Sequence, residues 1–351
     1  MARVYVTRDW FPEAQRPLHQ RHDVRMWTGP DTPPRDVLLS EVREIDGLIS
    51  IGSDDIDADV ITAGRRLRVI SQFGDGLEHV DLDEATRRRI PVGHTPDVLS
   101  ETTADLAFGL LLAAARRIVE GQAFARDGRW KAHAHLDLPG VDVNNKTLGI
   151  VGLGRIGSHV AKRARAFNMR VLYHSRTRHV QVESLLTATY QASLHEMLPQ
   201  CDFVVLTAPH TPDTRNIIGR EEFALMKPTS ILVNVARGAL VDEKALYDAL
   251  HTGQILRAAL DVTSIEPLPL DSPLFSLDNI LVMPHIGSAV PSTRERMMSM
   301  AVEQMLLALD GKRIPNCANP GVYKHVEVAD VSAVHGVQRS PITPPGHLRG
   351  Q

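Results

Sequence analysis

The chain has 351 residues, of which 43% are hydrophobic and 23% are charged, and its formal net charge is −3. This length is sufficient for about two domains of ordinary size, and the composition excludes a disordered chain. The weak negative charge gives no support for nucleic acid or an anionic membrane as a partner.

Up to about residue 100, short apolar runs alternate with polar or helical segments. Helices are predicted at Pro33–Arg43 and Leu82–Arg89. Buried strands are predicted at Arg3–Thr7, Val24–Thr28, Gly47–Gly52, Arg68–Phe73 and Pro91–Thr95. Because alternating strands and helices are typical of a parallel sheet, we expect one here.

A long helix is predicted next. Ser100 is a suitable N-cap, and Thr102–Arg117 is apolar over most of its circumference, which is typical of a helix buried between two layers. Gly121–Lys146 is rich in His, Gly and charged residues and has no clear period. We predict an irregular excursion there, because loops of this length are usually functional or interfacial.

A second series of elements begins at Thr147 and predicts a second parallel sheet. Its helices are predicted at Ser158–Phe167, Glu221–Met226 and Glu243–His251, and a final amphipathic helix is predicted at Thr293–Leu309. Its strands are predicted at Thr147–Val151, Arg170–Tyr173, Asp202–Thr207, Ser230–Val235, Leu256–Val262 and Ile280–Met283. Beyond about Lys324 the sequence loses its periodicity and predicts a flexible tail.

Two cysteines, Cys201 and Cys317, are too few for a disulfide framework or a cysteine-based metal site, and no metal is expected. The first residues lack the apolar segment of a secretory signal. The longest apolar run, Leu106–Ala115, is too short to cross a bilayer. We therefore expect a cytoplasmic protein that does not enter the membrane.

The segment from Gly152 to Gly157 has the spacing G-x-G-x-x-G between a predicted strand and a predicted helix, which is the context of a dinucleotide fingerprint. Gly152 permits the tight turn, Gly154 admits a pyrophosphate close to the backbone, and Gly157 lets the helix approach the sheet. The amides of Arg155 and Ile156 are expected to face the phosphates from the helix N-terminus. The alternative is an ordinary turn between a strand and a helix.

The strand that follows ends without the Asp or Glu that usually binds the ribose of NAD. It is followed instead by the Ser175 hydroxyl and the guanidiniums of Arg176 and Arg178, which suit a phosphate dianion. The sequence therefore predicts NADP in preference to NAD, with Ser175, Arg176 and Thr177 as contacts, and NAD as the alternative. The simpler explanation is a solvated basic loop.

Arg237, Glu266 and His285 each follow a predicted strand, so all three are expected at the carboxyl edge of the sheet, where such folds bind ligands. Arg237 can hold a carboxylate in a forked pair, and His285 can donate the proton that a keto group gains on reduction. Glu266 can bond His285, fix its tautomer and favour the protonated ring. Asp261 can accept from a nicotinamide carboxamide. Taken singly, each is more often a solvated or structural residue, and only the combination is specific.

These segments together resemble the signatures of the D-2-hydroxyacid dehydrogenase family over roughly residues 3–320. The segments that carry the resemblance are Val151–Gly157, Val233–Asp242, Asp261–Pro267 and Pro284–Ala289. Gly93–Leu99 with Thr102–Asp105, and Leu260–Ser264 with Glu266–Pro269, are most similar to the glyoxylate/hydroxypyruvate reductases. Ser175 and Arg176 resemble the NADP-using members.

The resemblance implies two Rossmann-like domains with parallel sheets, one flavodoxin-like and substrate-binding, the other dinucleotide-binding and inserted into the first. The expected boundaries are residues 1–99 with 287–325 for the substrate domain, 100–286 for the cofactor domain and 326–351 for the tail. A homodimer through the cofactor domain is implied, which would suit the excursion at Gly121–Lys146.

The resemblance also implies roles for single residues. Arg237 would bind the substrate carboxylate, and Glu266 would be the partner of His285, the acid and base. The nicotinamide side of the cofactor would contact Thr103 and Asp261. Val235 and Gly287 are further expected cofactor contacts.

Two stretches depart from the family pattern. Backbone amides near Asp75 and Gly76 are expected to receive the substrate carboxylate, yet the family commonly has a small or apolar residue where Asp75 stands. This acid must point away from the substrate, or the substrate differs. After Trp130 the chain has His133 and His135, and a metal pair there is disfavoured because no third ligand is evident.

The expected reaction is therefore NADPH-dependent reduction of glyoxylate or hydroxypyruvate to the D-2-hydroxy acid. One alternative is a dehydrogenase of the same fold acting on phosphoglycerate, a bulkier 2-keto acid, formate or phosphite. Another is a non-enzymatic, NAD(P)-sensing binding protein like the corepressors that share this fold. The presence of Arg237, Glu266 and His285 together argues against the second alternative.

Overall fold

The computed structural model describes residues 1–131 and 137–324. His133 and His135, and the predicted tail at 326–351, lie outside the described residues. The chain divides into two compact units, unit 1 comprising Met1–Pro96 with the chain from Glu295 on, and unit 2 comprising Asp97–Arg294. The boundaries expected from the sequence were at residues 99 and 287, close to these divisions.

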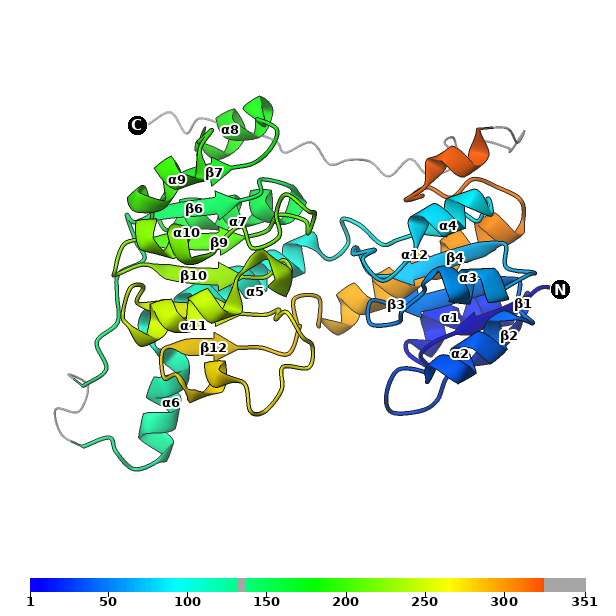
Figure 1. Cartoon of the computed structure of the whole chain (residues 1–351), viewed down its shortest axis with the longest axis horizontal. Coiled ribbons are helices and arrows are strands. Elements are labelled where there is room, and N and C mark those ends of the chain that lie inside the picture. The colour runs from blue at the N-terminus through cyan, green and yellow to red at the C-terminus, as the bar shows by residue number, and fades with distance from the viewer. Residues whose placement is uncertain (132–136, 325–351) are drawn as a thin grey trace, which may run out of the picture. The chain divides into compact units, whose positions relative to one another are not determined.

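Unit 1 contains a parallel sheet of five strands in the order β2-β1-β3-β4-β5 (Figure 1). This is the flavodoxin-like order, so the expected fold class of this unit is confirmed. The central strands β3 and β4 are almost wholly buried, as in a parallel sheet covered on both faces. The strands are β1 (Arg3–Val6), β2 (Asp23–Met26), β3 (Gly47–Ile51), β4 (Val69–Phe73) and β5 (Val92–Gly93).

Helices flank this sheet, and α12 contributes to its core. Met297, Met298 and Met305 of α12 are buried, and the Ser71 hydroxyl of β4 donates to the carbonyl of Ala301 at 2.9 Å. The helices are α1 (Pro12–His19), α2 (Arg35–Val42), α3 (Ala58–Ala63), α4 (Leu82–Arg87) and α12 (Pro291–Leu309). The sequence did not predict α1, which contains the internal proline Pro17, or the six-residue α3.

Unit 2 contains a parallel sheet of seven strands in the order β12-β11-β10-β9-β6-β7-β8. Its central part has the doubly wound order of dinucleotide-binding folds, with the change of direction between β6 and β9. The strands are β6 (Thr147–Val151), β7 (Arg170–His174), β8 (Ala188–Tyr190), β9 (Phe203–Leu206), β10 (Ile231–Asn234), β11 (Arg257–Leu260) and β12 (Ile280–Val282).

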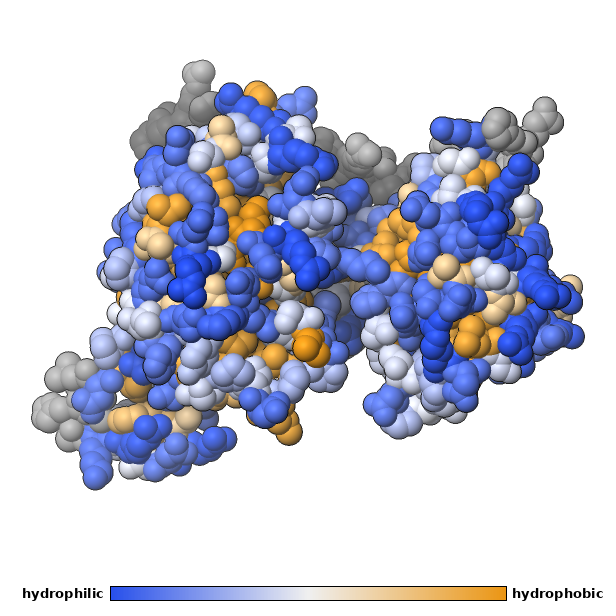
Figure 2. Space-filling model, viewed as in Figure 1, coloured by the Kyte–Doolittle hydropathy of each residue, from blue (hydrophilic) through white to orange (hydrophobic). Residues whose placement is uncertain are grey.

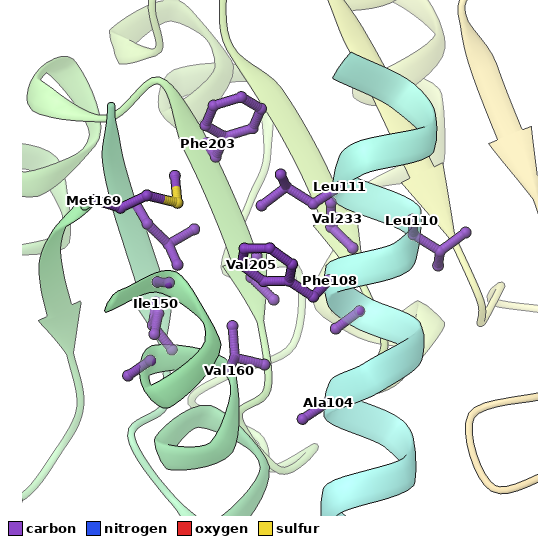
Figure 3. Packing of buried hydrophobic residues seen from close by; sticks show 14 of the residues in the cluster. Ala104, Phe108, Leu110, Leu111, Ile150, Val160, Met169, Phe203, Val205 and Val233 are labelled. Carbon is purple, nitrogen blue, oxygen red and sulfur yellow. The ribbon is translucent and has the colours of Figure 1, made fainter. Parts of the chain in front are cut away.

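Helices cover both faces of this sheet. Side chains alternate between the faces, so that Ile150 belongs to the core under α5 and α7 while Val151 belongs to the core under α9 to α11. Figure 3 shows Phe108 and Leu111 of α5 pointing toward Val205 of β9. The helices are α5 (Ser100–Arg116), α6 (Ile118–Arg126), α7 (Arg155–Ala166), α8 (Val180–Leu186), α9 (Leu194–Met197), α10 (Arg220–Leu225) and α11 (Glu243–His251).

Two local predictions for unit 2 were wrong. Ser100 does not cap α5, because it is the first helical residue and the cap position is taken by Leu99, whose side chain makes no capping bond. The predicted excursion begins later than expected, since Gly121 belongs to α6. This helix has no buried residue, and Ile118 and Val119 are exposed.

Polar side chains predominate on the face shown in Figure 2, where apolar residues are scattered. Exposed large apolar side chains include Trp10 in unit 1 and Ile118, Trp130 and Phe275 in unit 2. Over the described part of the chain, none of the helices has the length and apolarity that a membrane crossing requires.

Candidate active site

The register of the seven-stranded sheet aligns the ends of its strands. Val151 of β6 pairs with Leu206 of β9 on one side and with His174 of β7 on the other. Asn234 of β10 pairs with Leu206 and with Leu260 of β11. The residues that follow these strands therefore form one row at the carboxyl edge of the sheet, comprising Ser175, Gly152, Thr207, Val235 and Asp261.

The glycine turn has room for a phosphate. Gly152 has φ +96°, and a Cβ there would lie 2.6 Å from the Ala208 backbone, so only glycine fits. A Cβ on Gly157 would lie 2.2 Å from the Gly152 carbonyl, which confirms the close approach of α7 to the turn. At Gly154, by contrast, no described atom lies within 4 Å of that position. An open backbone that directly precedes Arg155, the first residue of α7, suits a pyrophosphate.

The loop after β7 contains the residues expected to distinguish NADP from NAD. Arg176 and Thr177 are exposed, and the Ser175 hydroxyl donates to the Thr177 carbonyl at 2.6 Å. Arg178, which the sequence offered as a second phosphate ligand, instead forms an ion pair with Glu183. Glu183 therefore holds the guanidinium of Arg178, although the Arg178 side chain stays 59% exposed.

The loop after β10 fixes the position of Arg237. Asn234 is fully buried; its Oδ1 accepts from the amide of Ala236 at 3.0 Å, and its Nδ2 donates to the carbonyl of Arg237 at 2.9 Å. The Arg237 guanidinium donates to the Ala236 carbonyl at 2.7 Å and is half-buried. A buried amide side chain that bonds the backbone on both sides of a turn leaves it little freedom.

Glu266 and His285 form a hydrogen-bonded pair. His285 Nδ1 lies 2.7 Å from Glu266 Oε2, and Glu266 Oε1 accepts from the amide of Thr263 at 3.1 Å. The imidazole side chain is 50% exposed and the Glu266 side chain 38% exposed. Because Nδ1 is bound to the carboxylate, Nε2 is the nitrogen that can exchange a proton with a bound molecule.

The backbone of His285 is held in a left-handed conformation, with φ +53°. Asp261, which is buried, fixes this loop: its Oδ1 accepts from Ile286 N at 2.7 Å and its Oδ2 from Gly287 N at 2.8 Å. The amide of His285 donates to the Asp261 carbonyl at 2.9 Å. Left-handed backbone at a residue other than glycine costs free energy, and such positions are common at functional sites.

Thr103, Gly287 and Asp261 come together beside this loop. A Cβ on Gly287 would lie 3.0 Å from Asp261 Oδ2 and 3.3 Å from Thr103 Cγ2. The structure thus brings together Thr103 and Asp261, which the resemblance assigned to the nicotinamide side, and Gly287, a further expected cofactor contact. Asp261 also makes a structural contribution that the sequence did not indicate, since both of its carboxylate oxygens hold the backbone of the His285 loop.

Burial and neighbouring groups shift the pKa values of Asp261 and Glu266 in opposite directions. Burial raises the pKa of Asp261, and the amide bonds from Ile286 and Gly287 oppose it only in part. Burial would also raise the pKa of Glu266, but the hydrogen bond and charge of His285, with the charge of Arg237, lower it overall. Glu266 is therefore ionised at neutral pH and is suited to stabilise a charged imidazole.

The turn expected to receive a substrate carboxylate belongs to unit 1, after β4. Asp75 Oδ1 lies 3.4 Å from His94 Nδ1, and the same nitrogen lies 3.1 Å from the Asp75 carbonyl oxygen. The acid is exposed and Gly76 is half-buried. Asp75 therefore directs its carboxylate toward His94, a neighbour that the sequence did not connect with it.

Three residues of unit 2 that contact the candidate site or its loops were not identified from the sequence. Asn234 orders the Arg237 loop, and the Thr207 hydroxyl donates to the Gly152 carbonyl at 2.6 Å. Arg294 is half-buried, and burial lowers its pKa against the opposing charge of Asp261. Arg237 was identified because ligands bind beyond the carboxyl ends of parallel strands. Thr207 follows β9 directly, so the same rule could have identified it from the sequence.

One cluster on α9 and α10 has the residue types of a metal site. Single ligand atoms of His195, Glu221 and Glu222 lie within 4.8 Å of one another. His195 Nε2 already lies 2.7 Å from Glu222, whose other oxygen accepts from the amide of Gly219 at the start of α10. Helix capping and one ion pair account for this cluster.

Gly238, which follows Arg237 directly, lies against the loop after β11. Its replacement tests whether the close packing of these two loops stabilises the protein. A Cβ there would lie 1.9 Å from the carbonyl carbon of Thr263. Gly238→Ala is expected to lower the free energy of unfolding by about 2–4 kcal/mol and the Tm by about 5–10 °C, because the two loops must separate. Calorimetry measures the Tm.

Gly109→Ala is the matched control, since Gly109 lies within α5 and no described atom lies within 4 Å of its Cβ position. This change is expected to be neutral or to stabilise by up to about 1 kcal/mol. If Gly238→Ala had the same Tm as Gly109→Ala, the close packing of these loops would not contribute to stability.

The chain is similar in sequence to known dehydrogenases. Residues 108–287 match the family model described as the D-isomer specific 2-hydroxyacid dehydrogenase, NAD binding domain. A glyoxylate reductase of Aeropyrum pernix is 44% identical over 326 residues, covering 92% of this chain and 97% of that protein. A glyoxylate reductase of Korarchaeum cryptofilum is 43% identical over 323 residues, with the same coverage of 92% and 97%.

Solved structures give the same result. The TT0316 protein from Thermus thermophilus has a TM-score of 0.85 and 48% identity, covering 90% of this chain and 99% of that one. The NADPH-dependent glyoxylate/hydroxypyruvate reductase from Sinorhizobium meliloti, in complex with NADP and malonate, has a TM-score of 0.79 and 30% identity. That match covers 90% of this chain and 96% of the Sinorhizobium chain.

Proposed function

The chain belongs to the D-isomer specific 2-hydroxyacid dehydrogenases, and we propose that it reduces glyoxylate or hydroxypyruvate to the D-2-hydroxy acid with NADPH as hydride donor. The bonded pair of Glu266 and His285 carries this proposal, because an imidazole oriented by a carboxylate is suited to transfer a proton. It lies on the same unit as Arg237 and the open glycine turn. The glyoxylate reductases of Aeropyrum and Korarchaeum support the choice of substrate.

Each side chain has a role in this reaction. Arg237 binds the substrate carboxylate as a forked ion pair and fixes the direction of the keto group. His285 donates a proton from Nε2 to the keto oxygen, and Glu266 holds Nδ1 so that the ring keeps this orientation. Asp261 keeps the His285 backbone in place. When bound, the nicotinamide cofactor supplies the hydride that the keto carbon accepts.

The cofactor site is proposed along the row of strand ends. The pyrophosphate is assigned to the turn of Gly152, Gly154 and Gly157, with the amides of Arg155 and Ile156. The nicotinamide end is assigned to Val235, Asp261, Gly287 and Thr103, and the 2′-phosphate to Ser175, Arg176 and Thr177. The bound NADP named for the Sinorhizobium relative supports this cofactor.

Parallel assays of NADPH and NADH oxidation test the reaction and the cofactor together. With glyoxylate or hydroxypyruvate, kcat/KM is expected to be about tenfold or more higher for NADPH, since a charge-assisted bond from Arg176 is worth about 1.5–3 kcal/mol. Arg176→Ala is expected to remove most of this preference. Faster oxidation of NADH would overturn the cofactor assignment, and no oxidation of either would overturn the proposed substrates.

The same assay separates the alternatives. Turnover of phosphoglycerate, phosphite or a bulky 2-keto acid in place of glyoxylate would identify another dehydrogenase of this family. Cofactor binding without turnover of any of these would favour a sensing protein. A homodimer and a cytoplasmic location stay predictions, for which gel filtration with light scattering and cell fractionation are the measurements.

A further inference from the structure

The loop between β7 and α8 carries two arginines with different surroundings. Arg178 donates from Nε and Nη2 to the two carboxylate oxygens of Glu183, at 2.8 and 2.9 Å. Its guanidinium also lies over the ring of Tyr190, 5.8 Å from the ring centre. Both arginines are exposed, but no residue in the described part of the chain forms an ion pair with Arg176. The two positive charges of the loop are therefore not equivalent.

The carboxylate of Glu183 is held in turn by a residue of the sheet. The hydroxyl of Tyr173, a buried residue of β7, donates to Glu183 Oε1 at 2.6 Å. That hydroxyl accepts in turn from the amide of His179 at 2.9 Å, which connects the end of the loop to the same group. The hydrogen bonds from Arg178 and Tyr173 lower the pKa of Glu183 to about 2. The carboxylate is thus ionised at neutral pH.

We propose that Glu183 sets the cofactor specificity of this protein by holding Arg178 in an ion pair, so that Arg176 alone supplies the charge that recognises a 2′-phosphate. The inference rests on the proposed use of NADPH. Glu183 acts here as a positioning residue, because it neutralises one of two arginines that would otherwise both attract the phosphate. The preference for NADP is therefore weaker than the sequence of the loop suggests.

The Glu183→Gln substitution gives this idea a measurable consequence. Glutamine keeps the length of the side chain and an oxygen that can accept from Tyr173, but it loses the charge that retains Arg178. Arg178 stands two residues after Arg176, a distance of at most about 7 Å along the backbone, which its side chain can span. The released guanidinium would then add its charge to the phosphate site.

Calorimetric titration of the full chain with adenosine 2′,5′-bisphosphate and with 5′-AMP measures recognition of the 2′-phosphate alone. Glu183→Gln is expected to tighten binding of the bisphosphate about fivefold and to leave the affinity for 5′-AMP unchanged. A fivefold change corresponds to about 1 kcal/mol, which is the size expected for one added contact between exposed charges. Arg178→Ala alone is expected to change the ratio of the two affinities by less than about twofold. The double variant is expected to return to the ratio of the unsubstituted protein.

Two controls keep the result interpretable. Tyr173→Phe removes the other bond to Glu183 but retains the ion pair, so its affinity ratio is expected to be unchanged. The Tm of each variant confirms that it is folded. The inference is overturned if folded Glu183→Gln keeps the original ratio, or if Arg178→Ala weakens bisphosphate binding as strongly as Arg176→Ala. Neither ligand contains nicotinamide, so failure of turnover with 2-keto acids would refute the proposed reaction and leave this result standing.

Discussion

His285→Ala is expected to lower kcat by about 10²- to 10⁴-fold, the usual contribution of a general acid, while the Kd for NADPH changes by less than about threefold. The reason is geometric: Nδ1 is bound to Glu266, so removal of the ring removes the one proton donor that this pair directs outward. Stopped-flow turnover with glyoxylate measures kcat, and quenching of protein fluorescence by NADPH measures the Kd.

Glu266→Gln is the companion variant, because it keeps the size of the side chain, removes the charge, and leaves one carbonyl oxygen in place of the two carboxylate oxygens that face Thr263 and His285. Ionised Glu266 stabilises the protonated ring of His285, and the lowered pKa of this carboxylate keeps it charged over the neutral range. Glu266→Gln is therefore expected to lower kcat for reduction, but by less than His285→Ala. A His285→Ala enzyme with undiminished kcat would show that another group donates the proton.

Arg237→Ala is expected to lower kcat/KM for glyoxylate by about 10³-fold, since the loss of a desolvated, charge-assisted pair costs about 3–5 kcal/mol. Asn234 holds the backbone at both sides of Arg237, and the loop is expected to keep its conformation in the variant. The loss should therefore appear in substrate kinetics, with little change in NADPH affinity. Steady-state kinetics at saturating NADPH give kcat and KM separately.

Arg237→Lys is the control for this prediction. Lysine keeps the charge but cannot form the forked pair with a carboxylate, so we expect an activity between those of the alanine variant and the unsubstituted protein. If Arg237→Ala changed kcat/KM by less than about tenfold, the carboxylate would have to be bound by another group. Equal loss in the lysine and alanine variants would show that the fork matters more than the charge.

The sequence determined much of the fold and the chemical identity of the site. β6 and α11 begin and end where their sequences predicted, because a short apolar run and an amphipathic helix are patterns of local residues. Arg237, Glu266 and His285 could be found because each follows a strand, and parallel strands deliver the residues at their ends to one edge of a sheet. The glycine turn was identifiable because its spacing reflects steric needs within a single turn.

The tertiary structure decided which side chains and backbone groups meet. The partners of Arg178, Asp75 and the His285 loop could not be predicted, because a side-chain contact depends on backbone geometry that residue spacing does not contain. Asp261 is separated from Gly287 by 26 residues, yet it holds this loop by a bond to the Gly287 amide. Sequence by itself therefore identified the groups proposed to react, and the packing of the loops decided how they are held.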